Sequence, residues 1–418
     1  MPNPNSSNSA KSTLNLLLPS LSKTLNQDQF AAALLRWHQQ DGRSGLPWQN
    51  LHDPYAIWIS EIMLQQTQVS TVLERYPRLM QRFPTVQALA AAPLDDVLAE
   101  WSGLGYYSRA RNLHACAKQI VRDYGGHFPQ ELTQLESLAG IGRSTAGAIA
   151  AFAFNLRTPI LDANVKRVLA RLFGIKGPVQ SKAVSDQLWQ LAQTLLPQEA
   201  KLMPRYTQAL MDFGATWCTA RQPICLSQQN SQIKKCPFEN RCIAKQSNQV
   251  LALPEKVIKT KSPEFDCEML IIQAQEQILL QRRPTEGIWG GLWSLPESSW
   301  QKIALDSVVQ SPKIKKSFSA KKLLQMILAS GQVAEKAVDQ FIKLSDKPAA
   351  GLLLKHVFTH RVLWIQSWRI QLNRPIPIAG TDYAWFKLNE LDALGLPQAI
   401  RIIFQDWNLI PGADKVNE

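Results

Sequence analysis

Four of the chain's six cysteines lie in one short segment whose spacing suits a metal centre. Cys218, Cys225, Cys236 and Cys242 leave six, ten and five residues between them. Thiolates bind zinc and iron–sulfur clusters, and zinc sites typically use paired C-x2-C knuckles, which this segment lacks. Wide loops between the ligands favour a 4Fe-4S cluster, whose irons lie well apart. Four reduced structural cysteines without metal are the alternative.

Two carboxylates stand where acid–base chemistry is possible. Glu61 has the apolar neighbours Trp58, Ile59 and Ile62, and partial desolvation raises a carboxyl pKa and suits it to proton donation. Asp162 precedes a clear helical pattern and is a natural N-cap. The simpler alternatives are a surface glutamate at the edge of an apolar stripe and a plain helix cap.

The segment LAGIGRSTAGAIAAF at 138–152 places Gly140 and Gly142 between two helical patterns. Such a turn can point backbone N–H groups at a phosphate, as a helix–hairpin–helix does on DNA. An αα-corner with glycines is the alternative. Gln65 and Gln66, one turn after Glu61, could hydrogen-bond bases.

The elements that position these residues are mostly helices. Apolar residues recur at helical spacing through 28–217, and Gly125 and Gly174 stand where helices should end. Polar residues 247–264 predict a linker. Beyond it, CEMLIIQAQEQILLQRRP predicts two strands around a turn, VLWIQSWRIQL a strand, and 319–331 and 333–344 helices. Residues 265–410 therefore predict an α+β domain, with tails at 1–27 (disordered) and 411–418.

The composition favours a polyanionic partner. Lys and Arg number 46 against 33 acidic residues in 418, a net charge of +13, which suits nucleic acid; a basic but otherwise ordinary enzyme is the alternative. No apolar run is long enough for a membrane span, and the first residues do not make a signal peptide. We expect a reducing compartment, which argues against structural disulfides and for metal at the clustered cysteines.

Taken in order, these motifs resemble the helix–hairpin–helix DNA glycosylase superfamily, and within it the MutY-type adenine DNA glycosylases. The matching stretches are LPWQN, SEIMLQQTQVSTV, WSGLGYYSRARNL, GIGRSTAGAI, LDANVKRVLAR, the cysteine segment, GIWGGLWSLPE and FTHRV. The resemblance implies a multidomain chain: an all-α helix–hairpin–helix glycosylase domain at 28–246, with a cluster loop at 218–242, then a Nudix-like domain at 265–410.

The resemblance also implies roles for single residues. Glu61 would protonate adenine, Asp162 would stabilise the cationic sugar, Asn164 would orient the pair, and Ser144 would line the same pocket. The four cysteines would hold a 4Fe-4S cluster. Residues implied to contact DNA are Trp48, Gln65, Tyr106, Gly140, Gly142 and Lys166, with Phe358, Thr359 and His360 reading 8-oxoguanine opposite the adenine.

The implied activity is excision of adenine mispaired with 8-oxoguanine or guanine in double-stranded DNA, within base excision repair. Two carboxylates with divided roles follow the logic of glycoside hydrolysis, and the base must be flipped out to be reached. Endonuclease III-type strand cleavage needs a lysine amine where this chain has Ser144, so we expect a monofunctional enzyme. We expect a monomer in the bacterial cytoplasm, associated with the nucleoid.

The second domain lacks the paired glutamates of a working Nudix enzyme after GGLWSLPE, which predicts a recognition module without hydrolase activity. A DNA-binding protein that has lost catalysis is disfavoured, because both carboxylates are present. Three departures from the family pattern stand out: ten residues between Cys225 and Cys236 instead of two, Ala139 in place of proline, and Ala163 in place of glycine. If position 163 needed a positive φ, alanine would cost about 1 kcal/mol.

Overall fold

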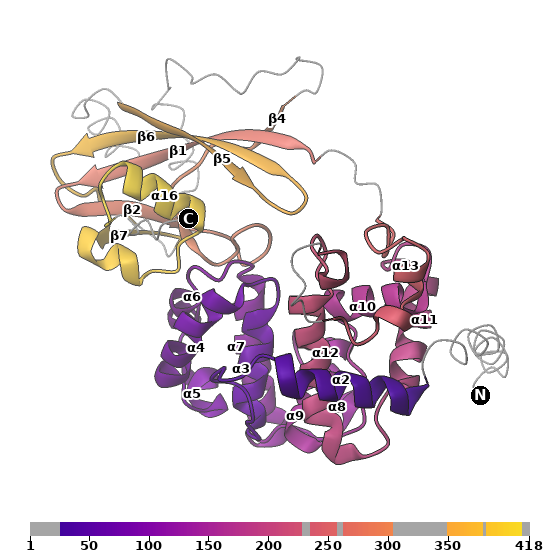
Figure 1. The fold of residues 1–418 in the computed structure, drawn as a ribbon. Coiled ribbons are helices and arrows are strands. Elements are labelled where there is room, and N and C mark those ends of the chain that lie inside the picture. The colour runs from indigo at the N-terminus through magenta and orange to yellow at the C-terminus, as the bar shows by residue number, and fades with distance from the viewer. Residues whose placement is uncertain (1–25, 228–234, 257–261, 304–348, 379–381, 412–418) are drawn as a thin grey trace, which may run out of the picture. The chain divides into compact units, whose positions relative to one another are not determined.

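The computed structural model of the chain describes residues 26–227, 235–256, 262–303, 349–378 and 382–411. These residues form two compact units (Figure 1). The first comprises the described parts of Met1–Ala91 and Ala115–Lys259, and the second those of Ala92–His114 and Thr260–Glu418. None of the described helices combines the length and hydropathy that crossing a bilayer requires.

The first unit is helical, as the periodicity predicts. Its helices are α2 (Gln27–Asp41), α3 (Pro54–Leu64), α4 (Val69–Arg82), α5 (Val86–Ala91), the end of α7 (Ser108–Tyr124), α8 (Leu132–Glu136), α9 (Arg143–Phe154), α10 (Ala163–Phe173), α11 (Lys182–Thr194), α12 (Met203–Asp212) and α13 (Ile243–Gln246). Single turns form η1 (Ala200–Leu202), η3 (Ile224–Leu226), η4 (Glu239–Arg241) and the π-helical η2 (Phe213–Trp217).

Local sequence explains where these helices begin and end. The Asp53 side chain accepts the N–H of Tyr55, and Pro54 opens α3 with a preset φ. Gln66 has φ of 56°, so the apolar pattern after α3 resumes as a separate helix, α4. Gly174 ends α10 with φ of 64°, a left-handed conformation that glycine adopts without strain.

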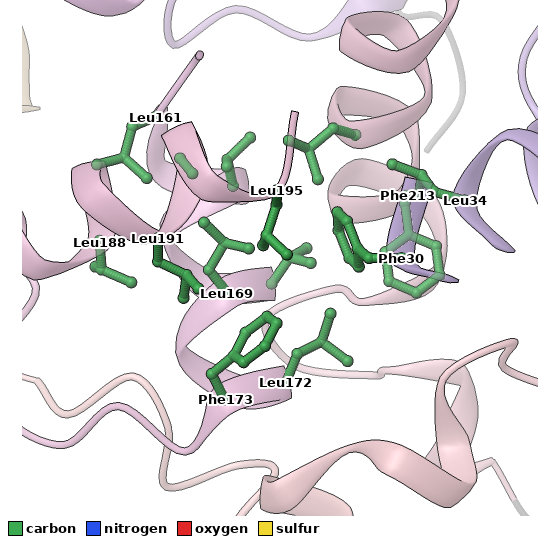
Figure 2. Packing of buried hydrophobic residues seen from close by; sticks show 14 of the residues in the cluster. Phe30, Leu34, Leu161, Leu169, Leu172, Phe173, Leu188, Leu191, Leu195 and Phe213 are labelled. Carbon is green, nitrogen blue, oxygen red and sulfur yellow. The ribbon is translucent and has the colours of Figure 1, made fainter. Parts of the chain in front are cut away.

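One apolar core joins α2, α10, α11 and the α12–η2 segment. Phe30 and Leu34 of α2 lie with Leu169 of α10, Leu188 of α11 and Phe213 of η2, all almost fully buried (Figure 2). Burying a side chain of this kind stabilises the fold by about 1.5–3 kcal/mol. The helix that begins after Asp162, α10, is therefore held by this core on the side of α2, α11 and η2.

The cysteine loop is tied into this core by an aromatic residue. The ring of Phe238, between the third and fourth cysteines, stacks on Phe30 at 5.3 Å between centroids and meets Phe213 edge-on at 5.3 Å. Its side chain is 1% exposed. The end of the loop is therefore anchored by packing as well as by any metal.

The second unit is built on a seven-stranded sheet. Its strands are β1 (Glu264–Ala274), β2 (Gln277–Arg282), β3 (Trp293–Ser294), β4 (Gln301–Lys302), β5 (Ala349–Val357), β6 (Val362–Leu372) and β7 (Tyr383–Lys387). The main order is β3-β2-β1-β6-β5, with β4 paired to β1 and β7 to β2. β1 and β6 are parallel over their whole lengths, while β1–β2 and β5–β6 are antiparallel. The strands predicted from sequence are confirmed.

Both faces of the central strands are covered, which explains their near-continuous apolar sequence. Met269 and Ile271 of β1 pack on one face with Ile400 and Phe404 of α16 (Gln398–Asp406), which lies against the sheet in Figure 1. The opposite face carries a second cluster that includes Leu270 and Trp368. A short 3-10 helix, η5 (Leu388–Ala393), precedes α16. The helices predicted at 319–331 and 333–344 lie outside the described residues.

Residues 92–114, expected within the helical domain, group with the sheet instead. This segment holds α6 (Leu94–Glu100) and the first turns of α7. The Tyr107 hydroxyl donates to the Leu396 carbonyl at 2.9 Å, and Arg111 Nη1 donates to the Gly290 carbonyl at 2.7 Å. The two contacts join residues that are 289 and 179 positions apart in the sequence. No local sequence pattern indicates contacts of this kind.

Candidate active site

Glu61 is the one acidic residue of a helix that is buried on nearly every side. Eight residues of α3, from Tyr55 to Met63, are buried around it. A helix that is apolar all round belongs inside a protein core. Its carboxylate therefore meets little water except through the cavity that it lines.

That cavity has a volume of about 260 Å³. Its wall includes Glu61, Trp48 and Phe152, with Arg43 and Gln208 from elements distant in the sequence. Trp48 is 8% exposed and meets Tyr76 edge-on at 5.5 Å, so it is fixed in place as part of the wall. Asp162, Asn164 and Ser144 are not among the residues that line this cavity.

Burial raises the pKa of Glu61 to about 8, and the nearby charge of Asp162 acts in the same direction. A carboxyl group with this pKa is largely protonated at neutral pH. Glu61 can therefore donate a proton to a group in the cavity, which an ordinary glutamate could not do at this pH.

Asp162 is the N-cap of α10, as its position before the helical pattern predicts. Its Oδ1 accepts the N–H of Val165 at 2.8 Å, and Asn164 Nδ2 donates to Oδ2 at 3.4 Å. Burial raises the pKa of Asp162, while these donors and the charge of Arg167 partly offset that rise. Ala163 has ordinary helical backbone, so the alanine at this position carries no strain.

Ser144 and Thr145 of α9 tie the segments next to Asp162 and Glu61 to this helix. Ser144 Oγ of α9 accepts the N–H of Leu161 at 3.0 Å, which fixes the residue just before Asp162. Gln65 ends α3, and its Nε2 donates to Thr145 Oγ1 of α9 at 3.3 Å.

The cavity wall contains a buried ionic network that the sequence analysis missed. The carboxylate of Asp212, 0% exposed, accepts Arg43 Nε at 2.8 Å, Arg43 Nη2 at 2.6 Å and Gln208 Nε2 at 2.9 Å. His38 Nε2 lies 3.2 Å from its other oxygen, which also accepts the Arg43 N–H at 3.0 Å. Burial alone would raise the pKa of Asp212, but the bonds from His38, Arg43 and Gln208 hold it below its usual value.

A second network runs from Asp162 towards the cysteine loop. Arg167 Nη2 donates to Asn164 Oδ1 at 2.8 Å and to the Gly214 carbonyl at 2.6 Å, and its Nε donates to the Cys218 carbonyl at 2.8 Å. A side chain at Gly214 would put its Cβ 2.8 Å from the Cβ of Asn164, so glycine is needed for this approach. Arg167 thus connects the Cys218 backbone with Asn164, the residue that bonds the N-cap Asp162.

The four cysteines line one enclosed cavity. Its wall holds the side chains of Cys218, Cys225, Cys236 and Cys242. The cations Arg171 and Lys245 lie beside them: Arg171 Nη1 reaches Cys218 Sγ at 3.5 Å, and Lys245 Nζ donates to the Cys225 carbonyl at 2.7 Å. Four thiols along one cavity, with cations nearby, fit an anionic iron–sulfur cluster in donor type. In the described residues, however, no three or more His, Cys, Asp or Glu side chains form a ready group for a metal ion.

The predicted hairpin is present between α8 and α9. Gly140 has φ of 75°, and Gly142 is the extended N-cap of α9, with no side chain to bond the helix's first N–H groups. Those N–H groups are thereby left for an external acceptor. The Lys166 ammonium, predicted to contact DNA, donates to the Val179 carbonyl at 3.4 Å.

Comparison with known proteins finds two domain families and close relatives of the whole chain. A profile of the HhH-GPD superfamily of base excision DNA repair proteins matches residues 59–194, and a NUDIX domain profile matches 268–406. The chain is 33% identical to an adenine DNA glycosylase of Buchnera aphidicola subsp. Baizongia pistaciae, over 89% of this chain and 94% of that protein. It is 36% identical to the adenine DNA glycosylase of Homo sapiens, over 90% of this chain and 73% of that protein.

The chain belongs to the adenine DNA glycosylase family. The predicted fold class is confirmed: a helical HhH-GPD domain precedes a sheet domain of the Nudix type. Family membership makes it a DNA N-glycosylase that removes adenine in base excision repair.

In this family member, the predicted reading residues lie on the turn between β5 and β6. The Phe358 N–H donates to the Arg361 carbonyl at 2.8 Å, which closes the turn and leaves Thr359 and His360 exposed. The Phe358 ring is backed by Trp289 and Trp300, at 5.5 and 6.3 Å between centroids.

Tyr106 lies beside this turn within the second unit. Its side chain is 48% exposed, its φ is 46°, and its hydroxyl lies 3.2 Å from Thr359 Oγ1. A large aromatic side chain that stays exposed is available to a partner. Residues predicted from two distant motifs are thus brought together.

Proposed function

We propose that the chain excises adenine opposite 8-oxoguanine or guanine in duplex DNA, by flipping the nucleotide out and hydrolysing its N-glycosidic bond. The observation that carries this proposal is the pair of Glu61 and Asp162, two carboxylates in unlike surroundings. One is held protonated and the other accepts hydrogen bonds to its charged form, which is the division of roles that glycosidic hydrolysis needs.

Glu61 supplies the proton. Adenine is a poor leaving group until a ring nitrogen is protonated, so the departing base needs an acid at neutral pH. The pKa of about 8 provides it at the wall of the cavity.

Asp162 stabilises the positive charge that the leaving base creates on the sugar. The Val165 N–H and the Asn164 amide favour its charged form. Asn164 is in turn fixed by Arg167, so the carboxylate is preorganised rather than recruited during the reaction. Water then completes the hydrolysis.

Strand cleavage is not part of the proposed reaction. A lyase forms an imine through a lysine amine, whereas Ser144 offers a hydroxyl that is bonded to Leu161 N–H. The lysine in LDANVKRVLAR is Lys166, and its amine donates to the backbone carbonyl of Val179. We therefore propose a monofunctional glycosylase acting as a monomer.

DNA recognition is assigned to two sets of residues, one in each unit. In the first, Gly140 and Gly142 present backbone N–H groups to a phosphate, Trp48 lines the cavity, and Gln65 ends the helix that carries Glu61. In the second, Tyr106 enters the duplex, and the turn of Phe358, Thr359 and His360 contacts 8-oxoguanine. Readout on the base edges gives specificity, and the phosphate contacts give register.

A 4Fe-4S cluster on Cys218, Cys225, Cys236 and Cys242 completes the proposal. When bound, it would act as a structural clamp, because hydrolysis moves no electrons. The loop would then hold Arg241 and Lys245 in fixed positions, where cations can meet phosphates.

A single-turnover assay tests the function on three duplexes: adenine opposite 8-oxoguanine, adenine opposite guanine, and thymine glycol opposite adenine. We expect strand breaks only after hot alkali, and only with the first two duplexes. Breaks without alkali on the thymine glycol duplex would establish a lyase. The inference from Ser144 to a monofunctional enzyme would then be wrong.

The Thr359 hydroxyl can be tested separately. Thr359→Ala should lower the ratio of rates on 8-oxoguanine and guanine duplexes by about 3–10-fold, because a hydrogen bond is worth roughly 0.5–1.5 kcal/mol. Thr359→Ser keeps the hydroxyl and should keep the ratio. Equal ratios in all three proteins would show that this residue does not read the oxidised base.

A further inference from the structure

Arg143, the first residue of α9, carries a charge that no acidic group neutralises in the part of the chain that the structure describes. Its side chain is exposed, and within that part its guanidinium makes no hydrogen bond or ion pair. The next two side chains differ. Ser144 Oγ accepts the Leu161 N–H at 3.0 Å, which engages the first of them. Thr145 Oγ1 accepts Gln65 Nε2 at 3.3 Å, so Arg143 is the polar side chain of this turn that is left for an outside partner.

This cation does not stabilise the helix that it begins. The N-terminus of a helix carries a partial positive charge, so anions stabilise it and cations oppose it. The N-cap is Gly142, which has no side chain to bond the first N–H groups of α9. Two successive residues thus give up helix stability, and both favour an anion at the same place.

The guanidinium of Arg143 is instead held on an aromatic ring. Its Cζ lies 4.1 Å from the ring centroid of Trp189 of α11, well within the range of a cation–π contact. Trp189 is partly buried and packs against the core that contains Leu188 and Leu191. The indole is therefore a fixed platform, and a guanidinium on an aromatic face keeps N–H donors for another group.

The acid closest to Trp189 along α11 does not take this charge. Asp186 lies one helical turn before Trp189, and its carboxylate pairs with Lys182 at 2.7 Å. The indole thus holds the Arg143 cation without neutralising it. A group that is to bind a phosphate needs this combination of fixed position and free charge.

We propose that Arg143 contacts a DNA phosphate beside the hairpin and that Trp189 is the residue that positions it. Arginine can bind a phosphate through two parallel N–H donors, and a guanidinium that is already held in place loses less conformational entropy on binding. The contact adds a charged side chain to the backbone N–H groups that follow Gly142. It rests on the proposed function in one respect, which is that the hairpin meets duplex DNA.

The salt dependence of DNA binding tests the contact. Binding of the full chain to an undamaged fluorescent duplex is measured by anisotropy from about 50 to 200 mM KCl, where each phosphate contact adds about 0.9 to the slope of log Kd against log salt concentration. Arg143→Gln should lower that slope by about 0.9 and weaken binding. Lys201→Gln is the control, because it removes an exposed cation that pairs with Glu199 at 2.7 Å, and it should keep the slope. An unchanged slope in Arg143→Gln would overturn the proposal.

A double-mutant cycle tests the role of Trp189. Trp189→Leu keeps the Arg143 charge but removes its platform, so the affinity should fall about 2–5-fold while the slope is kept. In the Arg143→Gln background the same change should have no effect, because no cation is left to position. Trp189→Phe keeps an aromatic face and should keep most of the affinity. A purely structural tryptophan would lower the affinity by the same factor in both backgrounds, and that result would overturn its positioning role.

The same measurements separate this proposal from the function on which it rests. If Trp189→Leu does not fold, Trp189→Met, which fills more of the space of the indole, takes its place in the cycle. If the unmodified protein does not bind duplex DNA, the proposed function falls and the Arg143 contact falls with it. If it binds with a salt-dependent affinity whose slope Arg143→Gln leaves unchanged, only the Arg143 contact falls.

Discussion

At the scale of single residues, the most informative feature is an acid placed where it is costly to ionise. Glu61 lies in a helix whose other buried residues are apolar except Ser60, and burial raises its pKa to about 8. The same burial that suits the group to proton donation must weaken the fold at high pH. Function and stability are therefore opposed at this one position.

We expect Glu61→Gln to abolish excision and to stabilise the protein at alkaline pH. The folded parent keeps a proton on Glu61 that the unfolded chain releases above about pH 4.5. The free energy of unfolding of the parent therefore declines from pH 4.5 upwards, and the decline ends as pH rises through about 8. The substituted amide remains neutral in both states. In denaturant unfolding at pH 8.5, the variant should exceed the parent by on the order of 1–3 kcal/mol, with little difference at pH 4.

Glu74→Gln on α4 controls for the loss of a surface carboxylate, because Glu74 is exposed. It should leave the free energy of unfolding nearly unchanged at both pH values. Equal stability of the parent and Glu61→Gln at pH 8.5 would mean that Glu61 is not held protonated, and a Glu61→Gln enzyme with near-normal turnover would remove the acid from the mechanism.

At the scale of elements, α9 depends on small residues to bring a neighbouring segment close. A Cβ at Gly147 would lie 2.4 Å from the carbonyl oxygen of Pro159, a distance that no side chain tolerates. Pro159 leads into Leu161 and Asp162, so the close approach helps to place the N-cap of α10. The run of alanines and glycines in this motif thus has a positional reason.

Gly147→Ala should therefore destabilise the protein although alanine favours helices. Helix propensity would gain about 1 kcal/mol, but overpacking costs typically 1–3 kcal/mol, and here the obstacle is backbone. We expect a net loss of about 2 kcal/mol in thermal or denaturant unfolding, with slower excision. Gly142→Ala, in the same motif but with open space around it, should lose less than about 1 kcal/mol. Equal losses would show that the Pro159 contact does not matter.

The cysteine loop is the second element with a testable property. If the four thiols hold a 4Fe-4S cluster, purified protein should contain about four iron atoms per chain, and Cys236→Ser should lose most of them. Cys116→Ala changes a buried cysteine outside the loop and should keep its iron. Zinc in place of iron, or full iron content in Cys236→Ser, would contradict the cluster assignment.

At the scale of the whole molecule, the division of the chain is not the one that the linker suggests. Residues 92–114 group with the sheet, although they lie in the middle of the helical sequence. Tyr107, Arg111 and Ser102 have hydrogen-bond partners beyond residue 289. Cutting the chain at the linker therefore removes contacts from a segment that the cut does not touch.

A fragment ending at residue 259 should reveal this in hydrogen exchange. Amides of 92–114 should exchange roughly tenfold or more faster than in the full chain, because their partners are absent. Amides of α10, whose core lies within the fragment, should exchange as before. Unchanged protection across 92–114 would mean that this segment belongs with the helices.

Short-range rules made much of the molecule predictable. Asp162 as a cap, Gly174 as a helix end, the helical periodicity and the β1–β2 hairpin all depend on neighbours a few residues apart. For the same reason, the spacing of the cysteines indicated a metal site, and the apolar neighbours of Glu61 indicated proton donation. Those features follow from the sequence alone, because local propensity and capping decide them.

Tertiary structure decided what local patterns cannot encode. Arg43 and Asp212 are 169 positions apart, and nothing near either residue signals that they share a buried hydrogen bond. By its sequence context Asp212 is an ordinary acidic residue at a helix end, but in the structure it is buried behind the cavity wall and binds three residues that line it. Contacts of this kind arise only when the core brings distant helices together. Glu61, the N-cap Asp162 and the four thiols were therefore visible in the sequence, while the wall of the cavity was not.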